Sequence, residues 1–232
     1  MSAFQHGIEA MKNSDDFKHM IFDIEDDNCL RFVRRFRNVR RFLMAFRESY
    51  EFIIAYHSTR LDEKERAGLK ISGLTTTSNE LLKEKAHTRF VKPSDTPSMK
   101  QQIGKIIDDF FREEQLVTIG QINLVIDKEL TEECYHYLLF GPESLLPLAD
   151  NLRRMLHTSF RGRMADFGTP VIVKARVPVA STHDTWVQGI FEYIKNGFPD
   201  VSLVYRNDLP PENIIGILDV RQPLDRNGFL YM

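Results

Sequence analysis

The sequence contains little cysteine. Cys29 and Cys134 are the two thiols among 232 residues, and neither belongs to a Cys-x-x-Cys pair. Two isolated cysteines supply neither a disulfide framework nor the closely spaced ligands of a structural zinc site. The histidines are scattered as well, so we expect no bound metal. A reducing compartment is the simplest interpretation, and we predict a cytoplasmic protein.

Long hydrophobic runs are also missing. No window approaches the roughly 18 to 20 apolar residues that a membrane-spanning helix needs. The N-terminal stretch MSAFQHGIEAMKNSDDFKH lacks the apolar core of a signal peptide. With 42% hydrophobic and 28% charged residues, the composition is that of an ordinary globular protein and excludes disordered, collagen-like and membrane-spanning classes.

Charge of one sign does not dominate the chain. Lys and Arg number 31 against 33 Asp and Glu, and the formal net charge of -2 gives no general reason to expect a nucleic-acid or membrane partner. The distribution is nevertheless uneven, because four acidic residues (Asp23, Glu25, Asp26 and Asp27) are followed at once by seven arginines (Arg31, Arg34, Arg35, Arg37, Arg40, Arg41 and Arg47).

Apolar residues recur within this basic run at spacings of four, three, four and three. That spacing predicts one amphipathic helix over residues 31–47, capped by Asp26–Asn28. We expect an N-terminal helical extension over residues 1–47 whose aromatic stripe docks on a domain at 48–232. The arginines either contact nucleic-acid phosphate, with Arg34, Arg37 and Arg41 as candidates, or form a solvated face. The stripe consists of Phe32, Phe36, Val39, Leu43 and Phe46.

The rest of the chain mixes helical and strand patterns without regular alternation, which favours an α+β fold. A capping box at Asp62 and Glu65 and a terminating Gly73 predict a helix over 61–71. A polar loop with Pro93 and Pro97 is expected after it. Further helices are predicted around 103–111, after Pro142 and over 186–196. Strands are predicted at 52–57, 116–119, 122–126, 135–140, 170–177, 201–205 and 214–220.

One constellation carries a family resemblance. His57 ends the strand predicted at 52–57, and residues 58–60 are expected to form a polar corner before the helix. The sequence Tyr56-His57-Ser58-Thr59-Arg60, followed by a helix and Ile71-Ser72-Gly73-Leu74, resembles the opening motif of the ADP-ribosyltransferase superfamily, in its diphtheria-toxin-like branch. The resemblance implies a mixed β core with peripheral helices and NAD as a substrate. It implies that His57 hydrogen-bonds the ribose of NAD and that the adjoining Ser58, Thr59 and Arg60 help to hold the cofactor.

Two further segments extend this resemblance. Tyr135-His136-Tyr137 resembles the family's middle strand, in which a tyrosine stacks on the nicotinamide ring, and we choose Tyr137 over Tyr135. The catalytic glutamate of the family lies near the start of the first closing strand, where this chain has Ser202. Glu143 and Glu192 are the nearest substitutes, and Glu143 is our candidate. A stacked aromatic and one carboxylate suit the oxocarbenium-like transition state of nicotinamide release.

Each of these residues also has a structural interpretation. His57 fits a buried, hydrogen-bonded histidine, Tyr137 a core tyrosine, and Glu143 an acid in the first turn of a helix. The sequence contains no P-loop, no GxGxxG motif after a strand and no nucleophile elbow.

Three functions therefore remain open. The first is an NAD-dependent ADP-ribosyltransferase that modifies a protein or nucleic acid, as toxins and phage-defence effectors of that superfamily do. The second keeps the fold as an RNA 2′-phosphotransferase or a catalytically silent binding module. The third is a nucleic-acid-binding protein that acts through the arginine-rich helix. The phosphotransferase would need additional arginines, for which the chain offers Arg66, Arg89, Arg153 and Arg161.

Overall fold

The computed structural model describes residues 21–113, 116, 118–133, 136–198 and 202–220. It contains both helices and strands, so the mixed α and β class is confirmed. No helix in these ranges is long and apolar enough to cross a membrane. The chain divides into two compact units: residues 1–55 with 176–202, and residues 56–175 with 203–232. This division differs from the boundary at residue 47 that the sequence suggests.

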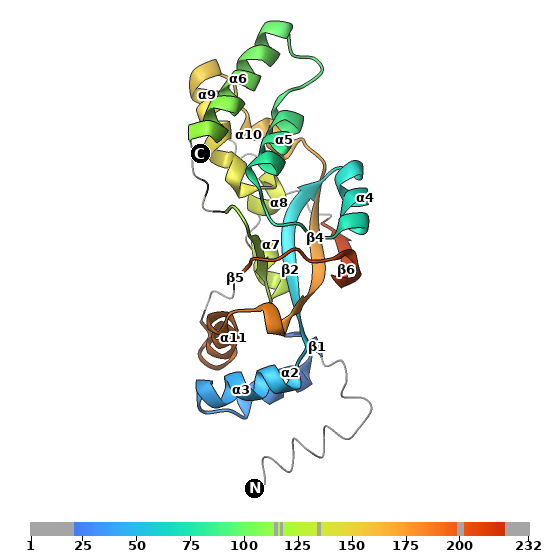
Figure 1. Ribbon diagram of the computed structural model, residues 1–232, viewed down its shortest axis with the longest axis vertical. Helices are drawn as coiled ribbons and strands as arrows, with labels where there is room; N and C mark the ends of the chain where they lie inside the picture. Colours follow the sequence, from blue (N-terminus) through green and yellow to red (C-terminus); the bar gives the residue numbers. More distant parts are fainter. Residues whose placement is uncertain (1–20, 114–115, 117, 134–135, 199–201, 221–232) are drawn as a thin grey trace. The chain divides into compact units, whose positions relative to one another are not determined.

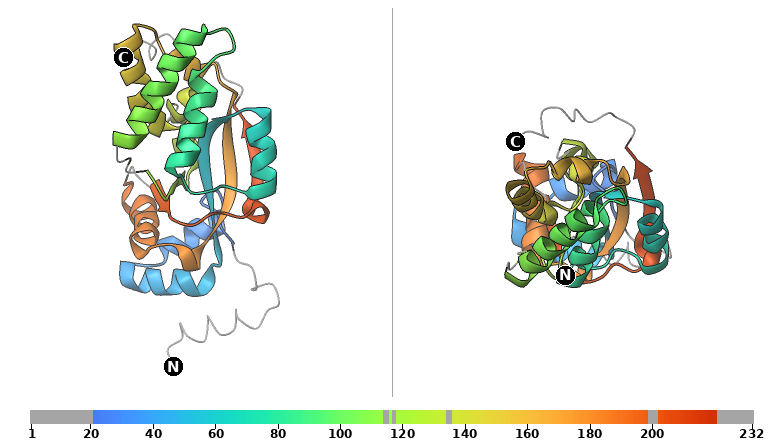
Figure 2. Two further views of the ribbon diagram at one scale, coloured as in Figure 1. Left: turned by 45° about the horizontal axis from the view of Figure 1, so that its top comes forward. Right: turned by 90° about the horizontal axis from the view of Figure 1, so that it is seen from above.

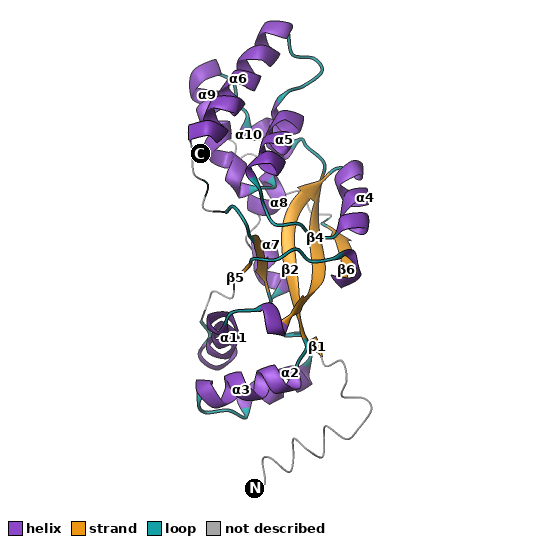
Figure 3. Cartoon of the chain, viewed as in Figure 1, coloured by secondary structure: helices purple, strands orange, loops and turns teal. Residues whose placement is uncertain are grey.

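The larger unit is built on a sheet with the strand order β5-β3-β2-β4-β6. The pairs β2·β3 and β4·β6 are antiparallel. Strand β2 is central. Its first residues belong to the smaller unit, as do the last residues of β4. In Figure 3 these strands lie side by side in orange. The strands are β2 (Phe52–Leu61), β3 (Ile122–Val125), β4 (Thr169–Pro178), β5 (Ser202–Tyr205) and β6 (Ile214–Asp219).

Helix α4 (Glu63–Ser72) follows β2 directly and lies beside β6 (Figures 1 and 2). Its predicted capping box is confirmed, because the Asp62 side chain accepts from the backbone N–H of Glu65 and Glu65 reciprocates. Gly73 ends the helix with φ 74° and ψ -162°, a positive φ outside the left-handed helical region that we expected. Leu74 then forms a β-bridge with Leu209, which fixes the chain after the helix.

A helical cluster gathers at one end of this sheet (Figure 2). It buries one continuous apolar core that includes Phe90, Ile107 and Phe160. The predicted helices around 103–111 and after Pro142 are confirmed. The cluster contains α5 (Asn79–Phe90), α6 (Pro97–Glu113), α8 (His136–Phe140), α9 (Leu146–Leu156) and α10 (Arg161–Ala165), with the 3-10 turn η2 (Glu143–Leu145) between α8 and α9.

Two strand predictions in this region are wrong. Residues 136–140 form helix α8, with three consecutive buried residues from Leu138 to Phe140, and Tyr135 lies outside the described residues. Residues 118–120 form a turn, and Leu116 is not in a strand. A short apolar run is compatible with a buried helix as well as with a strand, and its packing against the helical cluster decides between them. The short helix α7 (Lys128–Glu133) was also not predicted.

In the smaller unit, the predicted single helix over 31–47 is wrong. The chain forms α2 (Asp27–Arg34) and α3 (Val39–Ser49), and Asn38 caps α3 by accepting from the backbone N–H of Arg41 at 3.1 Å. A cap in mid-run stabilises a second helix start there. Because the helix is interrupted between α2 and α3, Phe42 is buried in the core, and the predicted Leu43 is not. The predicted cap of the first helix is confirmed at Asp26.

Aromatic packing holds the smaller unit together. Strand β1 (Ile21–Phe22) pairs in parallel with the first residues of β2, and helix α11 (Asp184–Asn196) packs on α2 and α3. The rings of Phe42 and Phe191 are 5.2 Å apart, and those of Phe42 and Phe46 are 5.3 Å apart. Gly197, with φ 64°, ends α11 as expected. The aromatic face of the basic segment is therefore docked.

Candidate functional site

His57 lies within the central strand. Because β2 continues to Leu61, the expected polar corner at residues 58–60 is wrong, and His57 does not end the strand. Successive side chains of a strand point to opposite faces. His57 and Thr59 therefore share one face, and Ser58 and Arg60 share the other. The four predicted cofactor-binding residues cannot all face one ligand on the same side of the sheet.

The imidazole of His57 is fixed by one hydrogen bond. Nδ1 lies 2.8 Å from the carbonyl oxygen of Asn123 on β3. A carbonyl only accepts, so Nδ1 donates, and Nε2 of the neutral ring is left as an acceptor. Burial lowers the pKa of His57, with the charge of Lys85 acting in the same direction. The ring is therefore neutral near pH 7 and offers Nε2 to a hydroxyl or N–H donor.

The residues around His57 include charges that were not predicted. Lys85 Nζ lies 3.8 Å from a carboxylate oxygen of Glu65. Arg89 donates to the carbonyl of Arg60 at 3.2 Å and to Glu65 at 3.3 Å. Burial lowers the pKa of both Lys85 and Arg89. The charge of Lys85 therefore acts on His57, while Glu65, Asp62 and Glu84 oppose the positive charge of this group.

Arg89 has spare hydrogen-bonding capacity. Its side chain is almost fully buried, and its Nε and Nη1 have no hydrogen-bond partner within the described part of the chain. The guanidinium lies 4.6 Å from the ring centroid of Phe167, a cation–π distance. Lys85 and Arg89 belong to α5, in a segment that the sequence led us to regard as a loop. The two guanidinium nitrogens of Arg89 without a partner among the described residues suit an anionic or polar ligand.

The other predicted cofactor residues differ in what they offer. Thr59 is buried on the face of His57. The hydroxyl of Ser58 is buried and has no partner among the described residues. Arg60 is 4% exposed and donates to three backbone carbonyls, at 2.8 to 2.9 Å. Arg60 therefore ties β2 to its neighbours, and this geometry favours a structural role for it. The three carbonyls belong to Leu138, Phe167 and Gly168.

The structure brings the two predicted catalytic residues together. The Tyr137 hydroxyl donates to Glu143 at 2.7 Å. The ring of His136 lies 4.1 Å from that of Tyr137, and its Nε2 is 4.0 Å from Glu143. Tyr137 is on α8, instead of a strand, and Glu143 begins η2 with its side chain about half exposed. The group forms a small polar cluster at the surface of the larger unit.

His57 makes no described contact with this Tyr137–Glu143 pair. Arg60, which points to the opposite face of β2 from His57, is the residue that contacts α8. Glu192 belongs to the smaller unit and accepts from Asn196. Ser202 begins β5 with an exposed side chain, so no glutamate occupies the start of that strand.

The arginines considered for a phosphotransferase site do not form a single cluster. Arg161 pairs with Asp150 at 2.7 Å, and Arg66 pairs with Asp219 on β6. Arg153 is exposed on α9. Of the four, Arg89 is the one that contacts β2, through the carbonyl of Arg60. The described ranges hold no group of three or more metal-ligating side chains. A hollow of about 210 Å³ lies between α6 and α9, and none of the predicted site residues lines it.

No protein-family model, curated protein or solved structure significantly matches this chain. The assignment of function therefore depends on the residues themselves.

The lowered pKa of His57 makes stability depend on pH. In the unfolded chain this histidine takes up a proton near pH 6.5, whereas the folded chain resists protonation until lower pH. Between these pH values the unfolded state binds more protons, so the free energy of unfolding falls as the pH falls. We expect Tm to decrease by a few degrees from pH 7 to pH 5, and less in His57→Gln.

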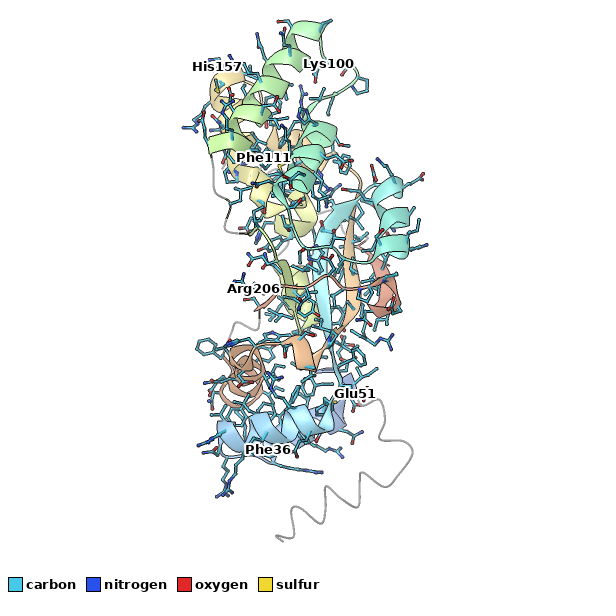
Figure 4. The ribbon with its side chains drawn as sticks, in the orientation of Figure 1. Phe36, Glu51, Lys100, Phe111, His157 and Arg206 are labelled. Carbon is cyan, nitrogen blue, oxygen red and sulfur yellow. The ribbon has the colours of Figure 1, made fainter. Side chains whose placement is uncertain are left out.

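The matched control for this experiment is His157→Asn. His157 is exposed and has a left-handed backbone, with φ 53°, which asparagine tolerates (Figure 4). Thermal unfolding followed by circular dichroism at several pH values measures the effect. An equal pH dependence in the wild type and His57→Gln would contradict the assignment.

Proposed function

We propose that the protein is an NAD-dependent ADP-ribosyltransferase that modifies a macromolecular target, with the NAD site at His57. The observation that carries the proposal is the fixed, neutral imidazole of His57, which leaves Nε2 as an acceptor and on which the charge of Lys85 acts. A ribose hydroxyl can donate to Nε2. Lys85 and Arg89 supply positive charge for the phosphates of a dinucleotide.

Tyr137 and Glu143 are the proposed catalytic pair. Their hydrogen bond at 2.7 Å joins an aromatic ring and a carboxylate, the two groups that nicotinamide release requires. The described structure has this pair without a contact to His57. Catalysis would therefore need Tyr137 and Glu143 to move towards the bound NAD. We include this movement in the proposed mechanism.

A second candidate function is a nucleotide-binding module without transferase activity. The specific observation that favours it is the exposed Ser202 at the start of β5, where the resemblance requires a glutamate. This module would bind the same ligand at His57 and would release no nicotinamide.

The binding part of the proposal is tested by thermal unfolding of the full chain with millimolar NAD. We expect NAD to raise Tm by a few degrees, since a ligand that binds the folded state stabilises it by mass action. His57→Ala should abolish this shift and Lys85→Ala should reduce it. The control variant His157→Asn should respond as the wild type does. No shift in the wild type would overturn the proposal.

The catalytic part is tested by transfer of label from NAD to protein and nucleic-acid acceptors, including 2′-phosphorylated RNA. Glu143→Gln should retain the Tm shift and lose at least a hundredfold in transfer rate, as expected for a group that acts in the transition state. Binding without transfer in the wild type would favour the silent module. Full transfer by Glu143→Gln would exclude Glu143 as the catalytic carboxylate.

A further inference from the structure

The basic segment of the smaller unit contains arginine as its only charged residue type. Residues 28–47 include seven arginines, no lysine and no acidic residue. Six of these arginines are exposed on α2, α3 and the turn between them. We call these six the arginine surface: Arg31, Arg34, Arg35, Arg37, Arg40 and Arg41.

Arg47, the seventh arginine, shows what a structural arginine in this segment looks like. It pairs with Asp184 at 2.7 Å and donates to the carbonyls of Val179 and Thr182 at 2.8 to 2.9 Å. By contrast, none of the six residues of the arginine surface makes an ion pair with any described residue. Within the described ranges, their charges are therefore not used in ion pairs that hold the fold together.

The arginine surface is displayed on a rigid support. Phe36 and Phe42 pack with their ring centroids 5.7 Å apart, and Phe42 packs in turn on Phe191 of α11. Figure 4 labels Phe36 at this support and shows nitrogen-tipped side chains extending from α3. Because the apolar faces of α2 and α3 are buried in the unit, the arginine positions are set by two folded helices.

This arrangement is unfavourable within the chain itself. Arg31 and Arg34 lie three residues apart on α2, where like charges repel. The first turn of α3 carries Arg40 and Arg41 and no acid, which opposes the helix dipole. An external anion bound across the arginine surface would relieve both effects.

We propose that the arginine surface binds the phosphate backbone of a nucleic acid. Guanidinium groups bind phosphate through two parallel hydrogen bonds, whereas ammonium groups act as point charges. The run contains arginine without lysine, although lysine occurs elsewhere in the chain. Six exposed arginines side by side suit a ligand that presents a row of phosphates, as a nucleic-acid backbone does. The inference is independent of the NAD site.

The test is fluorescence anisotropy of the full chain with labelled single-stranded RNA and with a duplex of about 20 base pairs, over a range of salt concentrations. We expect binding that weakens steeply with salt. The triple variant Arg34→Gln, Arg37→Gln, Arg41→Gln should bind at least tenfold more weakly. For duplex DNA, its slope of log K against log salt should be smaller by about 2 to 3, since each lost phosphate contact contributes about 0.9.

The matched control is Arg112→Gln, Arg153→Gln, Arg154→Gln, which removes three exposed arginines of the larger unit. It should leave affinity and salt slope unchanged, and neither triple variant should have a Tm more than a few degrees below that of the wild type. An equal loss in the two variants would overturn the proposal, as would tighter binding to anionic vesicles or to polyglutamate. His57→Ala should bind nucleic acid as the wild type does. The nucleic-acid proposal can therefore hold even if the NAD proposal fails.

Discussion

Replacing Arg60 with methionine should lower the free energy of unfolding by about 3 kcal/mol or more. The guanidinium donates to the carbonyls of Leu138, Phe167 and Gly168, and Arg60 is 4% exposed. Methionine keeps most of the aliphatic volume but leaves three carbonyls without their donors. An unsatisfied buried acceptor costs about 1 to 3 kcal/mol, so even partial rescue by water leaves a large loss.

Urea unfolding followed by circular dichroism measures this loss. Arg112→Met is the control, because Arg112 is 67% exposed and bonds to residues of its own helix region, and it should leave the stability close to that of the wild type. If Arg60→Met does not fold, Arg60→Lys provides the comparison, since one remaining donor should give intermediate stability. Wild-type stability in both Arg60 variants would show that these carbonyls are satisfied in another way.

Replacing Gly73 with alanine is the second substitution with a large expected effect. Gly73 has φ 74°, and a Cβ built on it would lie 1.9 Å from the carbonyl oxygen of Leu209. That carbonyl accepts from the backbone N–H of Leu74 at 2.9 Å, so relieving the clash breaks the Leu74–Leu209 bridge. Backbone strain and the lost bridge together should cost about 3 kcal/mol or more.

Gly68→Ala is the matched control within the same helix. A Cβ at Gly68 meets nothing within 4 Å, and alanine favours the helix by about 0.5 to 1 kcal/mol, so this variant should be slightly more stable. Differential scanning calorimetry measures the Tm of both variants, which should fall in Gly73→Ala and rise slightly in Gly68→Ala. Equal stability of Gly73→Ala and the wild type would mean that the close approach to Leu209 is absent in solution.

Local signals in the sequence predicted local structure well. The capping box at Asp62 and Glu65 and the terminating Gly197 were both found where the sequence indicated. These features depend on backbone groups within a few residues, so a short window contains the necessary information. The cap at Asn38 carries the same kind of signal, but the continuous apolar spacing across it favoured one longer helix.

Features that depend on distant partners could not be predicted. Helix α5 is rich in charged residues, and its buried face includes Ala86 and Arg89 as well as Leu82 and Phe90. A buried arginine is acceptable there because Glu65 and the ring of Phe167 accompany it, and neither is near in sequence. The apolar run at α8 was ambiguous for the same reason. His57 could be singled out, whereas Lys85, whose charge acts on it, and the buried Arg89 could not.

The discontinuous make-up of the two units has a consequence for synthesis on the ribosome. The smaller unit needs residues 176–202 to join residues 1–55, and the larger unit needs 203–232 to join 56–175. Arg47 and its partner Asp184 are separated by 137 residues. The aromatic face of α2 and α3 therefore emerges long before α11 can cover it, which exposes apolar surface in the nascent chain. The smaller unit can be completed only after α11 has been synthesised.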